Sequence, residues 1–282
     1  MEIYFLKRII SVEVDGAREM KNYKLSDETK TTAWGTVLHR VVATTSFTVA
    51  HGVVVVDAGN VGGWIEKESN LSDNAWVTGD AMIYGDAEVS GNAWITGEAH
   101  VFGNAQVSDT AQVYGDAEVS GDAWVSDNAK VFDNAEVYGN AKVSGSAKVY
   151  GKAWISGNAR VSDNARVSDD ARVYGKAWVS GDAWVSDNAK VFGNALVCDN
   201  AWIHGDAKVM STSDYVVFKN NWSSGRYFTW TKSNNKWAVG WFYGTGAELI
   251  KKAYADSEDN GKHYEAYVTL VETIMKNMER EK

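Results

Sequence analysis

The sequence predicts a mainly β protein made of three parts. A six-residue repeat runs through residues 74–205 without an insertion and gives 22 consecutive copies in a chain of 282 residues. The chain has 26 glycines and no proline, so glycine must make most of its turns. Beyond residue 210 the repeat gives way to a segment rich in aromatic residues. We expect an N-terminal β-rich cap over residues 1–61, a repeat region over 62–210 and a small C-terminal α+β domain over 211–282.

The N-terminal segment combines two β-rich runs with a polar stretch. The runs are IISVEVDG (9–16) and TVLHRVVAT (36–44), and the polar stretch between them is KNYKLSDETKTT (21–32). A stack of parallel strands leaves unpaired backbone at its ends, which favours aggregation, so this segment is expected to act as a cap.

Nothing in the first residues indicates secretion or membrane insertion. The opening MEIYFLKRIIS is interrupted by Glu2, Lys7 and Arg8, unlike the apolar core of a signal peptide. No apolar run approaches the roughly 18 residues that a membrane helix requires. We expect a cytoplasmic protein without a membrane partner.

Each repeat encodes a short strand followed by a corner. In NAWVTG (74–79), Ala75 and Val77 point the same way because side chains alternate along a strand. The residues on either side of the valine must then point outward. Pairs such as Gly-Asn, Gly-Asp and Asp-Asn follow, and these residue types tolerate the left-handed backbone of a sharp corner.

An aliphatic residue followed four positions later by a small one, as Val77 is by Ala81, resembles the hexapeptide-repeat, left-handed parallel β-helix family. In that family three hexads form one 18-residue coil of a triangular prism. The resemblance implies about eight coils, which at about 4.8 Å per coil make a prism about 38 Å long. The family includes acyltransferases, carbonic anhydrases and non-enzymatic proteins, so the fold does not fix the activity.

Sorting the outward residues at intervals of eighteen predicts one serine face and two aromatic faces. The serine column is Ser90, Ser108, Ser126, Ser144, Ser162 and Ser180, and it ends at Cys198. Rings in adjacent coils should stack. The ladders allow three interpretations: structural shielding, self-association and ligand binding. The candidates for binding on one aromatic face are Tyr114, Phe132, Tyr150, Trp184 and Trp202.

Charge and cysteine content exclude several kinds of site. Residues 62–210 hold 11 Lys and Arg against 21 Asp and Glu, which argues against binding to a nucleic-acid backbone. Cys198 is the single cysteine, so there is no internal disulfide, and we expect no reactive role for it. No phosphate-binding glycine loop or nucleophile elbow occurs, and we expect no cofactor.

Histidines and corner carboxylates are the only catalytic or metal-binding candidates in the repeats. The family's acyltransferases use a histidine base in a groove between subunits, which makes His100 and His204 the candidates for catalysis. Two histidines on different faces do not match the three zinc ligands of the family's carbonic anhydrases. The corner residues Asp109, Asp127, Asp163, Asp187 and Asp199 could bind calcium or could be there because corners favour aspartate.

The C-terminal unit predicts strands followed by helices. DYVVFKNN and GRYFTWTKSNNKWAVGWFYG indicate two or three antiparallel strands with SNNK as a turn. Thr245 to Glu248 forms a capping-box pattern before one helix, and a second helix is expected from about Lys262, with Met278 on its apolar side. The aromatic residues exceed the needs of a small core. The binding candidates in this unit are Trp222, Tyr227, Trp230, Trp237, Trp241 and Tyr243.

The segment that leads into the repeats narrows the resemblance. NYKLSDETK, followed by a β run and GGWIEKESNLSDNAWV (62–77), resembles hexapeptide-repeat proteins of bacteriophage and prophage genomes. The C-terminal unit is similar to domains appended to such proteins. The resemblance implies a phage or prophage origin.

These observations predict a non-catalytic phage-type accessory protein. We expect it to bind a bacterial host protein in the host cytoplasm, inhibiting or sequestering a defence component. A homodimer or homotrimer would form through the aromatic faces or terminal domains. The alternatives are an acyltransferase acting at a trimer groove and a self-associating structural scaffold.

Overall fold

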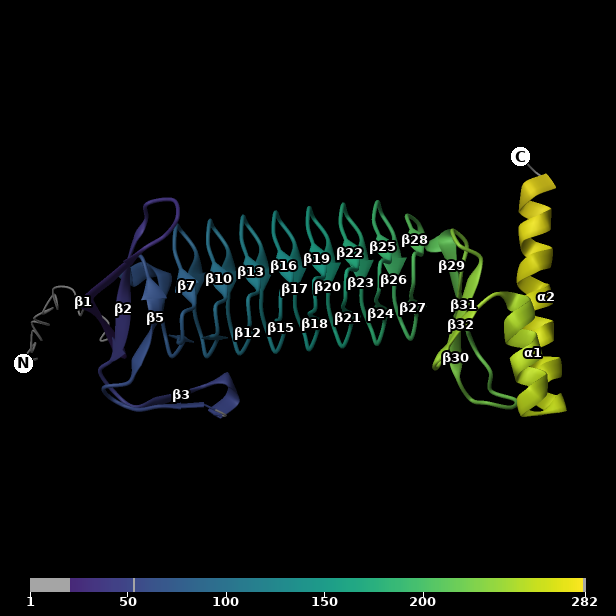
Figure 1. The fold of residues 1–282 in the computed structure, drawn as a ribbon, viewed down its shortest axis with the longest axis horizontal. Coiled ribbons are helices and arrows are strands. Elements are labelled where there is room, and N and C mark those ends of the chain that lie inside the picture. Colours follow the sequence, from purple (N-terminus) through teal and green to yellow (C-terminus); the bar gives the residue numbers. More distant parts are fainter. Residues whose placement is uncertain (1–20, 53, 281–282) are drawn as a thin grey trace, which may run out of the picture.

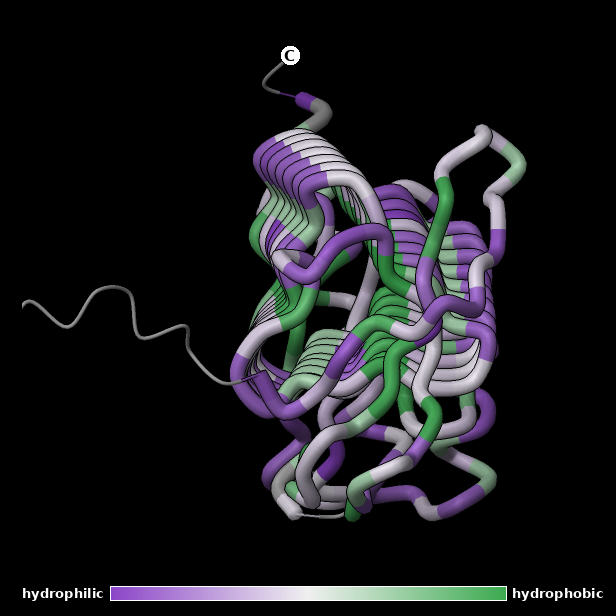
Figure 2. Tube along the Cα trace, turned by 90° about the vertical axis from the view of Figure 1, so that its left-hand side faces the viewer, coloured by the Kyte–Doolittle hydropathy of each residue, from purple (hydrophilic) through white to green (hydrophobic). Residues whose placement is uncertain are grey.

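The computed structural model describes residues 21–52 and 54–280, and for His51 and Glu279 only the backbone. The β-rich run predicted over residues 9–16 lies outside these residues. The described chain is mainly β, and its centre is a β-solenoid of about eight turns (Figure 1). Viewed along the axis, the coils lie in register behind one another, with hydrophilic residues stacked at the corners (Figure 2).

Three parallel sheets form the sides of the solenoid, and each coil contributes one two-residue strand to each sheet. The long face, which also takes in N-terminal strands, contains β1 (Tyr23–Thr31), β2 (Val37–Ala43), β5 (Val61–Ile65), β7 (Met82–Ile83), β10 (His100–Val101), β13 (Glu118–Val119), β16 (Glu136–Val137), β19 (Trp154–Ile155), β22 (Arg172–Val173), β25 (Lys190–Val191) and β28 (Lys208–Val209). The serine face contains β8 (Glu88–Val89), β11 (Gln106–Val107), β14 (Trp124–Val125), β17 (Lys142–Val143), β20 (Arg160–Val161), β23 (Trp178–Val179) and β26 (Leu196–Val197). The ladder face contains β6 (Trp76–Val77), β9 (Trp94–Ile95), β12 (Gln112–Val113), β15 (Lys130–Val131), β18 (Lys148–Val149), β21 (Arg166–Val167), β24 (Trp184–Val185) and β27 (Trp202–Ile203).

The coil period is eighteen residues, as the sequence predicts. Val131 pairs with Val113 and Val149, and the same offset relates every neighbouring pair of solenoid strands. The inward Ala and Val or Ile residues are fully buried along the whole stack, so they form one continuous, narrow core. The residue types therefore assign core and surface correctly at each hexad.

Corner residues adopt the left-handed backbone, and aspartates there bind the next coil. Asp127 has φ of 59° and accepts a hydrogen bond from the amide of Gly145 at 2.8 Å. Asp163 does the same for the amide of Gly181 at 3.0 Å. These carboxylates serve main-chain donors, and no three His, Cys, Asp or Glu side chains of the described residues gather as a metal-binding group.

The N-terminal cap is a hairpin that continues the long face. β1 pairs antiparallel with β2, β2 with β5, and β5 lies parallel to β7 of the first full coil. A separate hairpin, β3 (Phe47–Val49) and β4 (Val54–Val56), flanks a 3-10 turn at Ala50–Gly52. A further 3-10 turn spans Glu68–Asn70. Most of the polar stretch at 21–32 forms strand β1, which the sequence pattern did not predict. Much of this strand is exposed, so its residues lack the apolar alternation that indicates a strand.

The C-terminal domain is a four-stranded antiparallel sheet packed on two helices. A 3-10 turn (Thr212–Asp214) precedes β29 (Tyr215–Lys219), β30 (Tyr227–Thr231), β31 (Lys236–Val239) and β32 (Phe242–Gly244), which are followed by α1 (Gly246–Asp256) and α2 (Glu258–Arg280). The SNNK turn and the Thr245–Glu248 capping box are confirmed. The sequence missed the fourth strand, because WAVGWFYG reads as one run although the chain turns at Gly240.

Helix α2 differs from its prediction in its first residue and in the exposure of Met278. It begins at Glu258 instead of near Lys262, because the Ser257 hydroxyl accepts the amide of Asn260 at 3.1 Å and opens the helix earlier. Met278 is exposed, whereas Val268 and Val271 are buried. None of the helices in the described residues combines the length and apolar character needed to cross a membrane.

The two ends of the stack receive caps of opposite hydrogen-bonding character. Along the stack, amides of one coil donate to carbonyl oxygens seventeen residues later, as Trp76 does to Ala93. The first coil is therefore left with a row of carbonyls and the last coil with a row of amides. At the N-terminal end the Tyr23 hydroxyl donates to the carbonyl of Leu71 at 2.8 Å, and the Arg40 guanidinium donates to that of Gly79 at 3.2 Å.

At the C-terminal end, side-chain oxygens accept the free amides. The Thr229 hydroxyl accepts the amide of Trp202 at 2.8 Å, and the Ser233 hydroxyl accepts that of Lys208 at 2.7 Å. The Asp214 carboxylate accepts the amides of Met210 and Ser211 at 2.8 and 2.9 Å. The C-terminal domain thus docks on the last coil through its polar side chains.

Candidate functional site

The aromatic candidates of the solenoid lie together on the ladder face. Phe132 stacks between Tyr114 and Tyr150, with ring centroids 4.8 and 5.0 Å apart and nearly parallel planes. Trp184 and Trp202 stack at 5.0 Å. All five rings are half-buried. The predicted stacking is confirmed. Shielding of the bonds between coils, self-association and ligand binding all stay predictions.

Tryptophans in the repeats also reach back over the preceding coil. The indole N–H of Trp184 donates to the Ser168 hydroxyl at 3.0 Å, and that of Trp178 donates to Ser162 at 2.9 Å. In both pairs the serine lies sixteen residues earlier. At these two positions a serine in the preceding coil accepts the indole N–H, which explains part of the alternation of rings and serines along a column.

The serine face carries two exposed tryptophans that the column analysis did not single out. Trp124 and Trp178 are 42% and 43% exposed and lie three coils apart. The Lys142 ammonium lies 4.7 Å from the centre of the Trp124 ring. On the same face, burial raises the pKa of the Cys198 thiol, which keeps it in its unreactive form.

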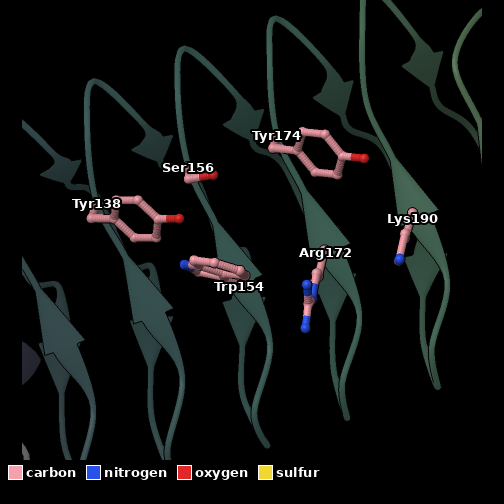
Figure 3. A pocket seen from close by; sticks show the side chains of 6 residues that line it. All are labelled: Tyr138, Trp154, Ser156, Arg172, Tyr174 and Lys190. Carbon is pink, nitrogen blue, oxygen red and sulfur yellow. The ribbon is translucent and has the colours of Figure 1, made fainter.

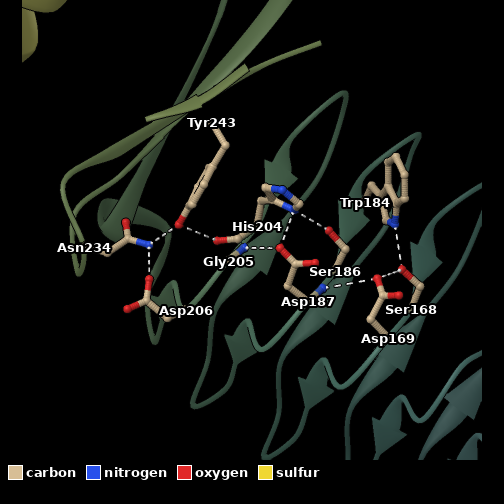
Figure 4. Close-up of polar contacts among 10 residues, drawn as sticks. All are labelled: Ser168, Asp169, Trp184, Ser186, Asp187, His204, Gly205, Asp206, Asn234 and Tyr243. Carbon is tan, nitrogen blue, oxygen red and sulfur yellow. Dashed lines mark hydrogen bonds and ion pairs between the residues drawn. The ribbon is translucent and has the colours of Figure 1, made fainter. Parts of the chain in front are cut away.

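His204 belongs to a hydrogen-bonded cluster beneath the C-terminal domain (Figure 4). Its Nδ1 lies 2.8 Å from the Ser186 hydroxyl and 3.1 Å from the Asp187 carboxylate. A catalytic relay needs the carboxylate and the nucleophile on different ring nitrogens. Here both share one nitrogen, and Ser186 is only 1% exposed. Ser186, Asp187 and His204 therefore do not form such a relay, and their contacts join two adjacent coils; catalysis at His204 stays an untested alternative.

The same cluster joins the solenoid to the C-terminal domain. The Tyr243 ring packs edge-on against His204 at 4.7 Å, and its hydroxyl donates to the His204 carbonyl at 3.2 Å. Asn234 donates to the Tyr243 hydroxyl and to Asp206, each at 2.9 Å. The hydrogen bond from Asn234 to Asp206 holds the pKa of the Asp206 carboxyl below its usual range. Tyr243, a predicted binding residue, therefore lies in an internal contact.

His100 lies on another face and near the other end. It lines a hollow of about 580 Å³ on the long face, which is also lined by Lys30 of β1 and by Trp34 in the turn after that strand. The Tyr84 and Phe102 rings stack beside it at 5.0 Å. His100 and His204 belong to different sheets, so they cannot act on one substrate within a single chain.

The aromatic candidates of the C-terminal domain divide into core and surface. Trp230 and Trp237 are buried against the helices, so they stabilise the domain. Trp222 is 69% exposed and Trp241 is fully exposed, and Tyr227 is partly exposed beneath the Lys219 ammonium. Sequence alone could not sort them, because their burial depends on the packing of α1 and α2.

Comparison with known proteins supports the repeat architecture. The family model described as the YdcK beta solenoid repeat matches residues 111–127, 153–168 and 165–181, all within the solenoid. A search of curated proteins gave no match. The chain is therefore a β-solenoid repeat protein, and the comparison assigns it no activity.

Proposed function

We propose that the protein is a non-catalytic binding protein whose solenoid presents the C-terminal domain to a partner protein. The observation that carries the proposal is the exposure of Trp222 and Trp241 on that domain. The domain lies at one end of a rod of about eight coils, far from the N-terminal cap (Figure 1). A rigid rod of this kind separates its two ends by a fixed distance.

Exposed tryptophans are unusual and often dominate protein interfaces, because each buries a large apolar area when a partner binds. Trp241 projects from the turn between β31 and β32. Trp222 lies 6.3 Å from both His263 and Tyr267 by ring centroids, so α2 restricts its position before binding. Restricted aromatic side chains lose little entropy on association.

The identity of the partner rests on the resemblance of the lead-in segment to phage and prophage proteins. On that basis the partner is a bacterial host protein, and the role is inhibition or sequestration of a defence component in the host cytoplasm. The cluster around His204 supports this proposal over an acyltransferase. The capped ends support it over an end-to-end polymer, because the main-chain groups described above are already bonded.

The test is affinity capture from a bacterial lysate, followed by binding with the purified partner. We expect wild-type protein to recover a specific host protein that is lost with the double variant W222A/W241A. Trp34→Ala is the matched control, because Trp34 is 88% exposed at the other end of the rod. Equal recovery by all three proteins would refute the role of the C-terminal domain. Tight binding of acetyl coenzyme A that depends on His204 would favour the acyltransferase.

We also propose that α2 carries the homo-oligomer contact. Leu270, Ile274 and Met278 lie four residues apart on α2 and are exposed, whereas the opposite side of the helix packs on the sheet. At 1.5 Å per residue, the 23 residues of α2 extend about 34 Å, about twice the length of α1. The same row on a second copy would cover it. Light scattering should show a dimer for wild type and a monomer for I274K; a monomeric wild type would refute the contact.

A further inference from the structure

The aromatic column on the long face is interrupted by serine at two positions, Ser120 and Ser156. Rings in consecutive coils stack there, as Tyr84 and Phe102 do at 5.0 Å and Tyr174 and Phe192 do at 5.1 Å. Ser156 stands between Tyr138 and Tyr174, where the column would otherwise continue. The result is a hollow of about 290 Å³, shown in Figure 3.

The width of this gap suits one flat ring. Tyr138 and Tyr174 are two coils apart, which corresponds to about 9.6 Å at the usual strand spacing. A ring inserted midway would lie about 4.8 Å from each, within the range of stacked aromatic pairs. Ser156 forms the floor, and in Figure 3 the Tyr138 hydroxyl points toward the gap.

Trp154 forms the side of the gap without filling it. Its ring leans on Tyr138, with centroids 5.3 Å apart and planes inclined by 36°. Trp178 and Trp184 find a serine acceptor sixteen residues earlier, but at Trp154 that position is Tyr138. The buried indole nitrogen of Trp154 has no hydrogen-bond partner among the described residues, and the same is true of Trp94 and Trp202.

Positive charge borders the gap on its C-terminal side. The Arg172 guanidinium lies 4.9 Å from the centre of the Trp154 ring, and Lys190 follows in the next coil. Neither forms an ion pair with a described residue. A smaller hollow that shares Trp154 and Arg172 with the gap mixes both signs of charge, because Glu136, Asp170 and Lys152 also line it.

We propose that this slot binds a planar aromatic ring that carries a phosphate, as a mononucleotide does. The base stacks between Tyr138 and Tyr174 above Ser156. The phosphate meets Arg172 and Lys190, since a guanidinium binds phosphate oxygens in a bidentate manner. This site is separate from the C-terminal surface proposed for a protein partner, so either proposal can fail alone.

The same face contains a comparable gap with the opposite charge. Ser120 stands between Phe102 and Tyr138, which again leaves room for one ring. The residues that border it in the neighbouring column are Glu118 and Glu136. The second gap should reject a phosphate through like-charge repulsion, which makes it an internal control.

The experiment is calorimetric titration of the intact protein with adenosine 5′-monophosphate, with adenosine and inorganic phosphate titrated separately. We expect saturable binding of the nucleotide at one site and at least tenfold weaker binding of either part. Ser156→Phe should abolish binding by completing the column, and Ser120→Phe should leave it unchanged. Arg172→Gln should weaken nucleotide binding about tenfold and leave adenosine binding unchanged.

Thermal unfolding of each variant establishes whether it is folded. Arg172→Gln tests the site independently of Ser156→Phe, because Arg172 is exposed and its replacement leaves the core intact. Absence of saturable nucleotide binding, or equal binding of the nucleotide to Ser156→Phe and wild type, would overturn the proposal. Equal affinities for the nucleotide and adenosine would overturn the phosphate assignment to Arg172 and Lys190.

Discussion

The two caps end the same stack in chemically opposite ways. The N-terminal cap provides donors, such as the Tyr23 hydroxyl, for the carbonyls of the first coil. The C-terminal cap provides acceptors, such as the hydroxyls of Thr229 and Ser233, for the amides of the last coil. Covering the end of a parallel solenoid therefore requires the correct hydrogen-bonding partner as well as an apolar surface, and the two caps could not exchange places.

The caps also differ in how they are held together. The N-terminal cap extends the long face through β5, β2 and β1, and Tyr23 and Val41 belong to the same core as the solenoid. The C-terminal domain has a core of its own around Phe228 and Trp237. The C-terminal cap should therefore unfold separately, whereas the N-terminal cap should be coupled to the first coil.

Replacement of Trp237 by alanine gives the largest expected effect. Trp237 is 2% exposed, and deleting such a side chain from a core costs about 3–5 kcal/mol. In hydrogen exchange, β29 to β32 should lose protection together with the amides of Trp202 and Lys208. Protection in the middle strands β15 and β18 should remain. Trp241→Ala is the control, with an expected change within about 0.5 kcal/mol. Loss of protection throughout the solenoid would show that the domain is not separate.

Alkaline pH should release the C-terminal cap through Tyr215. This hydroxyl donates to the Leu196 carbonyl at 3.0 Å, and burial raises the pKa of Tyr215 to about 12. Because the folded-state pKa lies above the unfolded value near 10, the stabilisation is complete below pH 10 and is lost as the pH rises toward 12. Two pKa units correspond to at most about 2.7 kcal/mol.

The measurement is the free energy of unfolding as a function of pH for wild type and Tyr215→Phe. The difference between them should shrink between pH 10 and 12, and Tyr227→Phe, at a more exposed tyrosine, should follow wild type. Burial also raises the pKa of Tyr23, with a further contribution from Glu68, so the N-terminal cap should weaken at high pH as well. A constant difference across this range would refute the assignment to Tyr215.

Thr229→Val tests the acceptor chemistry of the C-terminal cap with little change of shape. Thr229 is 1% exposed, so valine would leave the amide of Trp202 buried without an acceptor. An unsatisfied buried amide costs about 1–3 kcal/mol. Urea denaturation should show this loss for valine and a much smaller one for Thr229→Ser, which keeps the hydroxyl. If the two variants were equally stable, covering the last coil with the domain would be enough to stabilise this end, and a hydrogen-bond acceptor for the Trp202 amide would not be needed.

The sequence predicts the solenoid far better than the caps. Val131 and Ala129 have the same surroundings as their counterparts one coil away, so local residue types determine their burial. The cap contacts join residues such as Tyr23 and Leu71, 48 positions apart, in a pattern that occurs once. No periodicity reveals contacts of that kind.

Surface assignments show the same limit. Stacking of Phe132 with its neighbours follows from the eighteen-residue column, and the structure confirms it. The burial of Trp230 and the exposure of Trp241 depend on where the helices pack, and nearly identical residue types lie on both sides of that division. The gap at Ser156 is visible in the column, but its meaning depends on the charges that border it.

Replacement of Asp127 gives the smallest expected change in stability. It tests whether carboxylates inside the stack stabilise it by accepting backbone amides, as they do at the C-terminal cap. Its carboxylate accepts the amide of Gly145, as Asp214 accepts the amide of Met210 at the end of the stack. Asp127→Ala removes this bond and keeps a left-handed backbone that alanine disfavours, so we expect a loss of about 1–2 kcal/mol in urea denaturation. Asp127→Gly removes the bond but suits that backbone, so its loss should stay below about 1 kcal/mol. If both variants lost the same stability, the carboxylate hydrogen bond alone would explain the aspartates at the corners. If only the alanine variant lost stability, the left-handed backbone would be the dominant requirement inside the stack. Hydrogen-bond acceptors would then matter mainly at the C-terminal end of the stack.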